Sequence, residues 1–69
     1  MNVFEKYSNG PGNDLTRMWA LRAFSAVVNN REGRMTFKMV TDDQMRRILD
    51  DDDYAIWIAK KREHAAATM

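Results

Sequence analysis

The sequence predicts one small, mostly α-helical domain, with short helices at about residues 14–31, 41–51 and 52–66 packed around the first of them. Three observations predict this class. The segment of the first helix is apolar around most of a helical circumference, a capping box precedes the second helix, and four aspartates precede the third helix. The 69 residues suffice for a single domain, and the absence of cysteine excludes a disulfide scaffold. The pattern also allows a two-stranded ribbon formed by residues 2–7 and 35–40.

The N-terminal residues 1–13 are expected to form an arm and a turn. Residues 2–7 are compatible with a short strand or a loose arm, and residues 8–14 contain Asn-Gly and Gly-Pro-Gly, which are typical of turns because glycine adopts positive φ readily. We therefore place the helical domain at residues 14–66 and expect residues 67–69 to fray.

The first helix is expected to be the buried centre of the domain. Asn13 or Asp14 can cap its N-terminus, and Gly33, Asn29 or Asn30 can end it at the C′ position. Its polar wedge is narrow, and a helix that is apolar nearly all round is normally covered on several sides.

The connector after the first helix alternates large apolar residues, Met35, Phe37 and Met39, with polar ones. This period of two is typical of a half-buried strand. Such a strand would pair with residues 2–7 and complete the ribbon.

The second helix carries a complete N-terminal signature. Thr41 at the N-cap and Gln44 at N3 predict a capping box, and Val40 and Met45 are spaced for a hydrophobic staple. Two pairs of opposite charge four residues apart are expected on its surface: Asp42–Arg46 and Asp43–Arg47.

The aspartates at residues 50–53 indicate a break between two helices. If the second helix continued, Asp52 would fall on the apolar stripe that contains Ile48 and Leu49. Aspartate is a poor helix-interior residue but a good cap, so the break is placed near residues 51–52. Residues 54–59 also alternate as a strand would, but the basic tail that follows favours a helix.

No residue pattern points to catalysis, a metal or a cofactor. The aspartate run lacks the glycine that a calcium loop requires at its sixth position, and His64 is the only histidine. Ser8 and Ser25 lack a nucleophile signature, and the chain has no phosphate-binding glycine loop. We therefore expect a protein that is not an enzyme.

The chain contains no apolar run of membrane-spanning length, because the longest has only six residues, 54–59. The N-terminus also lacks the basic and apolar regions of a secretory signal. We expect a soluble, cytoplasmic protein with no membrane partner.

The wide apolar face of the first helix predicts a non-enzymatic protein-binding module that modulates or inhibits a larger partner, or that associates with itself. Accessory regulators of phage or plasmid type are often of this size. Aromatic and arginine side chains are typical interface anchors, and the aspartates offer an acidic patch. The expected partner-binding residues are Trp19, Arg22, Tyr54, Trp57, Asp50, Asp51 and Asp53.

The alternative is a nucleic-acid-binding regulator. The helices at 41–51 and 52–66 superficially resemble a helix-turn-helix pair, with basic residues near the end of the second. Against this, aspartates at the start of the reading helix would repel phosphates. The residues expected to bind nucleic acid are Arg31, Arg34, Lys60, Lys61 and Arg62.

Overall fold

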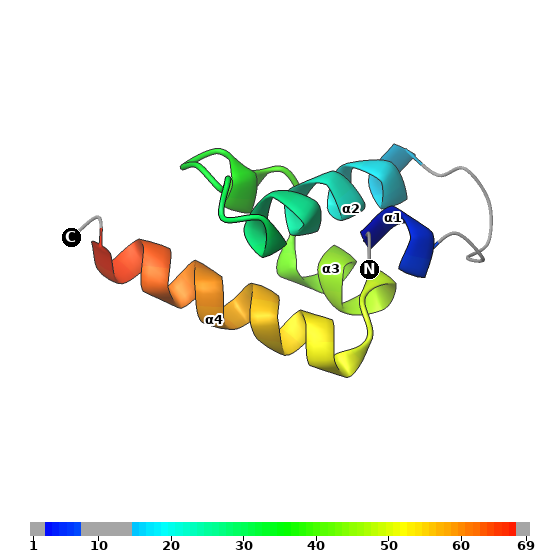
Figure 1. The fold of residues 1–69 in the computed structure, drawn as a ribbon. Coiled ribbons are helices and arrows are strands. Elements are labelled where there is room, and N and C mark those ends of the chain that lie inside the picture. The colour runs from blue at the N-terminus through cyan, green and yellow to red at the C-terminus, as the bar shows by residue number, and fades with distance from the viewer. Residues whose placement is uncertain (1–2, 8–14, 68–69) are drawn as a thin grey trace.

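The computed structural model describes residues 3–7 and 15–67, and this part of the chain is mostly helical (Figure 1). In chain order it contains helix α1 (Val3–Lys6), helix α2 (Leu15–Val28), the 3₁₀-helix η1 (Thr36–Lys38), helix α3 (Asp42–Ile48) and helix α4 (Asp51–Ala67). The three longer helices lie where the sequence predicts them, with ends that differ by up to three residues.

Helix α2 packs against α1, η1, α3 and α4, and α3 also packs against α4. In Figure 1, α4 runs along one side of the molecule, and its C-terminal turns project beyond the other helices. This projection makes the molecule elongated, with extents of 38 × 22 × 19 Å.

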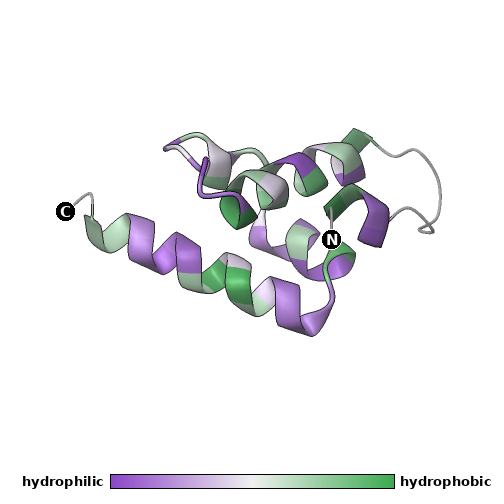
Figure 2. Cartoon of the chain, viewed as in Figure 1, coloured by the Kyte–Doolittle hydropathy of each residue, from purple (hydrophilic) through white to green (hydrophobic). Residues whose placement is uncertain are grey.

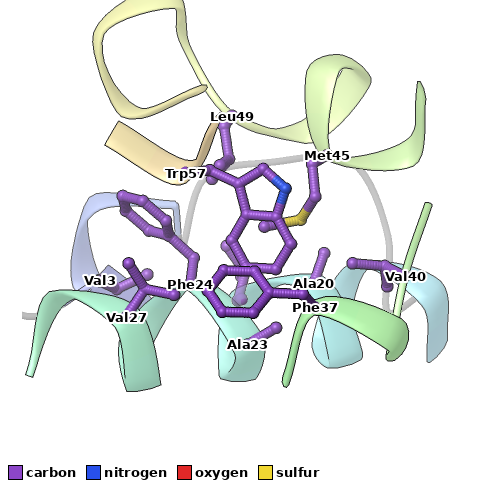
Figure 3. Packing of buried hydrophobic residues seen from close by; sticks show 11 residues of the cluster. Val3, Ala20, Ala23, Phe24, Val27, Phe37, Val40, Met45, Leu49 and Trp57 are labelled. Carbon is purple, nitrogen blue, oxygen red and sulfur yellow. The ribbon is translucent and has the colours of Figure 1, made fainter. Parts of the chain in front are cut away.

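The core lies between α2, α3 and α4 and is closed by η1 and α1 (Figure 3). Trp57 from α4 is completely buried, and its ring centroid lies 5.0 Å from that of Phe37 in η1. The other buried hydrophobic residues are Val3, Ala20, Leu21, Ala23, Phe24, Val27, Val40, Met45 and Leu49. Most of these come from α2, because its buried face meets every other element.

The C-terminus of α2 is closed by a Schellman motif. Asn30 adopts a left-handed conformation with φ of 55°, its N–H donates to Val27 O, and the N–H of Arg31 donates to Ala26 O. Asn30 is therefore the C′ residue, while the N–H of Gly33 donates to the Thr36 hydroxyl beyond it. The proposed N-caps, residues 13 and 14, lie outside the described residues.

The predicted ribbon is wrong for the part of the chain that the structure describes. Residues 3–6 form α1 and residues 36–38 form η1, and neither segment is extended. The physical reason is that only Phe37 of the alternating apolar residues enters the core, together with its neighbour Thr36, whereas Met35 is 67 % exposed. A helical turn brings adjacent residues inward in this way, whereas a strand would point them to opposite faces.

The predicted capping box of α3 is confirmed. The Thr41 hydroxyl accepts from the N–H of Gln44 at 3.1 Å, and the Gln44 side chain accepts from the N–H of Thr41 at 2.9 Å. Asp42 does not follow the expected pairing along its own helix, because its carboxylate accepts from Lys61 Nζ at 2.8 Å and from Trp57 Nε1 at 3.4 Å. Its hydrogen bonds therefore connect α3 to α4.

The break between α3 and α4 falls slightly earlier than predicted. Leu49 is extended, and Asp50 caps α4 because its Oδ1 accepts from the N–H of Asp53 at 2.8 Å. The strand alternative for residues 54–59 is wrong, because these residues lie within α4. The helical spacing of four brings Asp53 and Trp57 to the same buried side.

The capping box predicts that two variants of Thr41 differ in stability. Thr41→Ala removes the acceptor for Gln44 and should lower the unfolding free energy by about 1 kcal/mol, which corresponds to a melting temperature lower by roughly 4–8 °C in a domain of this size. Thr41→Ser keeps the hydroxyl and serves as the control. Equal melting temperatures for the two variants, measured by circular dichroism, would contradict the role of the cap.

Candidate functional site

The N-terminal half of α2 carries an exposed apolar surface, which we call the α2 face and define as Leu15, Met18, Trp19 and Arg22. These residues follow the helical spacing i, i+3, i+4 and i+7, so they lie along one side of α2. The side chains of Leu15, Met18 and Trp19 are 64 %, 51 % and 43 % exposed. The core residues of α2 occupy its opposite side, and the α2 face is therefore a surface on a core helix that the described residues leave exposed.

The rim of the α2 face is basic. The guanidinium of Arg22 lies over the Trp19 ring at 5.5 Å from its centroid, a cation–π contact. A shallow hollow of about 230 Å³ adjoins it, lined by Phe4, Arg22, Ser25, Ala26, Asn29 and Arg31. This lining contains two arginines and no carboxylate of the described chain, which favours a negatively charged border on any molecule that covers the face.

Hydropathy along the other long helix is distributed differently. Figure 2 shows that the middle of α4 is hydrophobic, that its first turn and the turns after the middle are hydrophilic, and that its last turn is again weakly hydrophobic. Trp57, a predicted partner-binding residue, lies in this hydrophobic middle; it is completely buried and donates to Asp42, so the structure places it in the core and not on the surface. Tyr54 is half-buried against the core, with Arg46 over its ring at 5.8 Å.

The aspartates at the start of α4 hold α1 rather than stand free. Lys6 Nζ lies 2.8 Å from Asp50 Oδ2 and 2.7 Å from Asp53 Oδ2. The Tyr7 hydroxyl donates to Asp53 Oδ2 at 2.5 Å and accepts from the N–H of Asp50 at 3.1 Å. We call these four residues the α1–α4 clamp. Of the aspartates predicted to bind a partner, the structure places Asp53 buried within the clamp, whereas Asp51 is exposed.

The clamp is fixed to α2 as well, because the guanidinium of Arg17 donates to the backbone carbonyl of Tyr7. Its charges also shift one another's protonation. The hydrogen bond from Lys6 lowers the pKa of Asp50, and hydrogen bonds to Asp50 and Asp53 raise the pKa of Lys6. Burial, followed by the hydrogen bond to Asp53, raises the pKa of Tyr7 to about 12.

The residues expected to bind nucleic acid are distributed over several places. Arg34 and Lys61 line a hollow of about 610 Å³ between the η1 region and α4, which we call the basic hollow; its other lining residues are Phe37, Lys38, His64 and Ala65. Lys60 instead contacts Glu32 at 3.9 Å and donates to Asn30 at 3.2 Å. Arg31 lies at the rim of the α2 face, and Arg62 is exposed without lining the basic hollow.

Sequence reasoning missed several residues that the structure places at these surfaces. Leu15 and Met18 share the helical spacing of Trp19, so their exposure with it could have been anticipated from the sequence. Phe4 and Lys38 could not, because each comes from a segment that was assigned to the ribbon.

Within residues 3–7 and 15–67, no group of three or more acidic, histidine or cysteine side chains is arranged to hold a metal ion. None of the helices in the same residues has both the length and the apolar character needed to cross a membrane. Compared with protein-family models, curated proteins and solved structures, the chain matches none of them. The described part of the chain is thus a small, mostly helical globule with two surface features, the α2 face and the basic hollow.

The α1–α4 clamp predicts a difference between two tyrosine variants. Tyr7→Phe removes a donor to the Asp53 carboxylate and an acceptor for Asp50, and should lower the unfolding free energy by about 1.5–3 kcal/mol. Tyr54→Phe is the matched control, because the Tyr54 hydroxyl forms no hydrogen bond to a described residue. Urea unfolding followed by circular dichroism measures both, and an equal loss in the two variants would contradict the clamp.

The clamp also predicts how stability depends on pH. Asp50 has a lowered pKa in the folded chain, so its contribution is present above its ordinary value of 3.8 and is lost as the pH falls below it. Lys6 and Tyr7 have raised pKa values in the folded chain. Their contribution to stability is therefore present below the ordinary pKa values, 10.5 for Lys6 and 10.0 for Tyr7, and is lost as the pH rises. The urea concentration at the midpoint of unfolding should therefore decrease at low pH and at high pH. The variant Lys6→Gln should weaken both decreases. An unchanged profile in Lys6→Gln argues against the ion pair.

Proposed function

We propose that this protein is a small binding module that modulates a larger protein by docking the α2 face onto it. The observation that carries the proposal is the exposure of three large apolar side chains, Leu15, Met18 and Trp19, along one side of the helix whose other side forms the core. Such a continuous apolar surface is typical of an interaction site, whereas singly scattered exposed apolar residues need no explanation.

The free energy available from this surface is substantial for so small a chain. Complete burial of one large apolar side chain contributes about 1.5–3 kcal/mol, and the α2 face offers three that are at present 43–64 % exposed. Trp19 and Arg22 belong to the residue types that dominate binding energy in interfaces. Because α2 is held by the core on its opposite side, little conformational entropy is lost when the face is covered.

The partner is identified by its chemistry as an apolar protein surface bordered by aspartate or glutamate. Arg22 and Arg31 supply the positive rim, and no described carboxylate lines the hollow between them. Complementary charges at a rim increase the association rate and suppress wrong partners. These features favour an acidic, amphipathic segment of a larger protein over a second copy of this chain, which would bring arginines to the same rim.

The test uses variants matched in chemistry and exposure. Leu15→Gln/Met18→Gln makes the α2 face polar, and Met35→Gln/Ile56→Gln makes the same changes at exposed positions elsewhere. A protein captured by the wild-type chain is purified, and its affinity is measured by calorimetry. We expect at least a tenfold weaker affinity for the first variant, weaker binding for Arg22→Glu, and less than a twofold change for the control.

Two results would count against the proposal. One is a captured protein that binds wild type and Leu15→Gln/Met18→Gln equally well while both remain folded by circular dichroism. The other is a concentration-dependent dimer of the wild type in sedimentation velocity that the double variant abolishes, because the α2 face would then be occupied by a second copy of the chain.

A further inference from the structure

The basic hollow is a second surface, formed by other elements than the α2 face. Arg34, Phe37 and Lys38 line it from the η1 region, and Lys61, His64 and Ala65 line it from α4. Its volume of about 610 Å³ lies within the range of about 300–1,000 Å³ that is typical of small-molecule sites. The hollow therefore has room for an organic ligand rather than for an ion alone.

The charge of the basic hollow is strongly unbalanced. Arg34 and Lys38 form no ion pair with any carboxylate of residues 3–7 and 15–67, whereas Lys61 is paired with Asp42 at 2.8 Å. Two unpaired cations thus remain on the wall formed by the η1 region, and no carboxylate lines the hollow. An arginine guanidinium and a lysine ammonium are the groups that proteins use to bind phosphate.

The base of the basic hollow is apolar and partly aromatic. The rings of Phe37 and His64 lie 5.2 Å apart at an angle of 39°, and Ala65 lies beside them in the lining. The Nε2 atom of His64 is buried and has no hydrogen-bond partner among the described residues. The lining of the hollow thus combines two ring faces with the methyl group of Ala65, which offers apolar contact to a planar group.

The hollow next to the basic hollow has a mixed charge. The neighbouring hollow, beyond His64, is lined by Glu32 and Glu63 as well as Lys60 and Ala67. The ammonium of Lys60 is occupied by Glu32 and Asn30. A nucleic-acid strand requires a row of cations that follows successive phosphates. Beside the basic hollow, the described lining residues include two carboxylates, which a strand's next phosphate would meet.

We propose that the basic hollow binds a mononucleotide-class ligand, that is, a phosphate monoester joined to a planar ring system. The phosphate lies between Arg34 and Lys38, which supply charge-assisted hydrogen bonds. The planar part lies against His64, Phe37 and Ala65. This site is independent of the α2 face, so the protein can carry a small anion and a protein partner at the same time.

The experiment measures the binding of adenosine monophosphate to the full chain by calorimetry and by the amide shifts in NMR spectra at low salt. Inorganic phosphate, adenosine and a single-stranded oligonucleotide of about 12 nucleotides are titrated in parallel. We expect adenosine monophosphate to bind at least tenfold more tightly than phosphate or adenosine, with shifts concentrated around Arg34, Lys38 and His64.

Charge-removing variants separate a specific site from general attraction. Arg34→Gln/Lys38→Gln should weaken the binding of adenosine monophosphate at least tenfold, while Arg62→Gln, an exposed residue of α4 outside the hollow, should change it less than twofold. The mutated side chains are exposed, so the fold should persist, which circular dichroism verifies.

Several outcomes would overturn the proposal. Equal affinities for adenosine and adenosine monophosphate would exclude the phosphate contact, and equal affinities for phosphate and adenosine monophosphate would exclude the planar subsite. An oligonucleotide that binds far more tightly than the mononucleotide, and is weakened by Arg62→Gln as well, would identify a strand-binding surface instead. The absence of binding by every probe at millimolar concentration would also refute the site.

Discussion

The complete burial of Trp57 is the constraint on which the rest of the structure depends. One side chain from α4 contacts the core residues supplied by α2, α3 and η1, and its ring packs on Phe37 (Figure 3). Its indole N–H donates to Asp42 at 3.4 Å, and the same carboxylate accepts from Lys61, so the buried indole and the surface ion pair fix a single register between α3 and α4. A chain of 69 residues without disulfides depends on such large aromatic contacts for most of its stability.

The α1–α4 clamp explains how a four-residue helix can be part of the fold. An isolated helix of this length is unstable in water, because nucleation is costly and few internal hydrogen bonds repay it. Here Val3 is buried in the core, and Lys6 and Tyr7 bind the aspartates at the start of α4. The Asp50 carboxylate also caps α4, and both carboxylates offset the positive end of its dipole. Asp50 and Asp53 therefore hold α1 against the start of α4.

The two candidate surfaces arise from different consequences of this packing. Helix α2 has more apolar circumference than the short neighbouring elements can cover, so Leu15, Met18 and Trp19 remain exposed. The basic hollow lies where the η1 region and the C-terminal half of α4 meet, beside the contact between Phe37 and His64. The surplus of apolar side chains could be read from their helical spacing, whereas the approach of Arg34 and Lys38 to α4 depends on the path of the connector.

The sequence by itself determined the features that rest on local physics: the helical class, the capping box at Thr41 and Gln44, and the break before α4. Each of these depends on hydrogen bonds or steric preferences within a few residues. Only the tertiary structure decided that residues 3–6 and 36–38 are helical, that Trp57 is enclosed, and that Asp42 bonds to α4. Those outcomes depend on contacts between residues far apart in the chain, which local spacing does not specify.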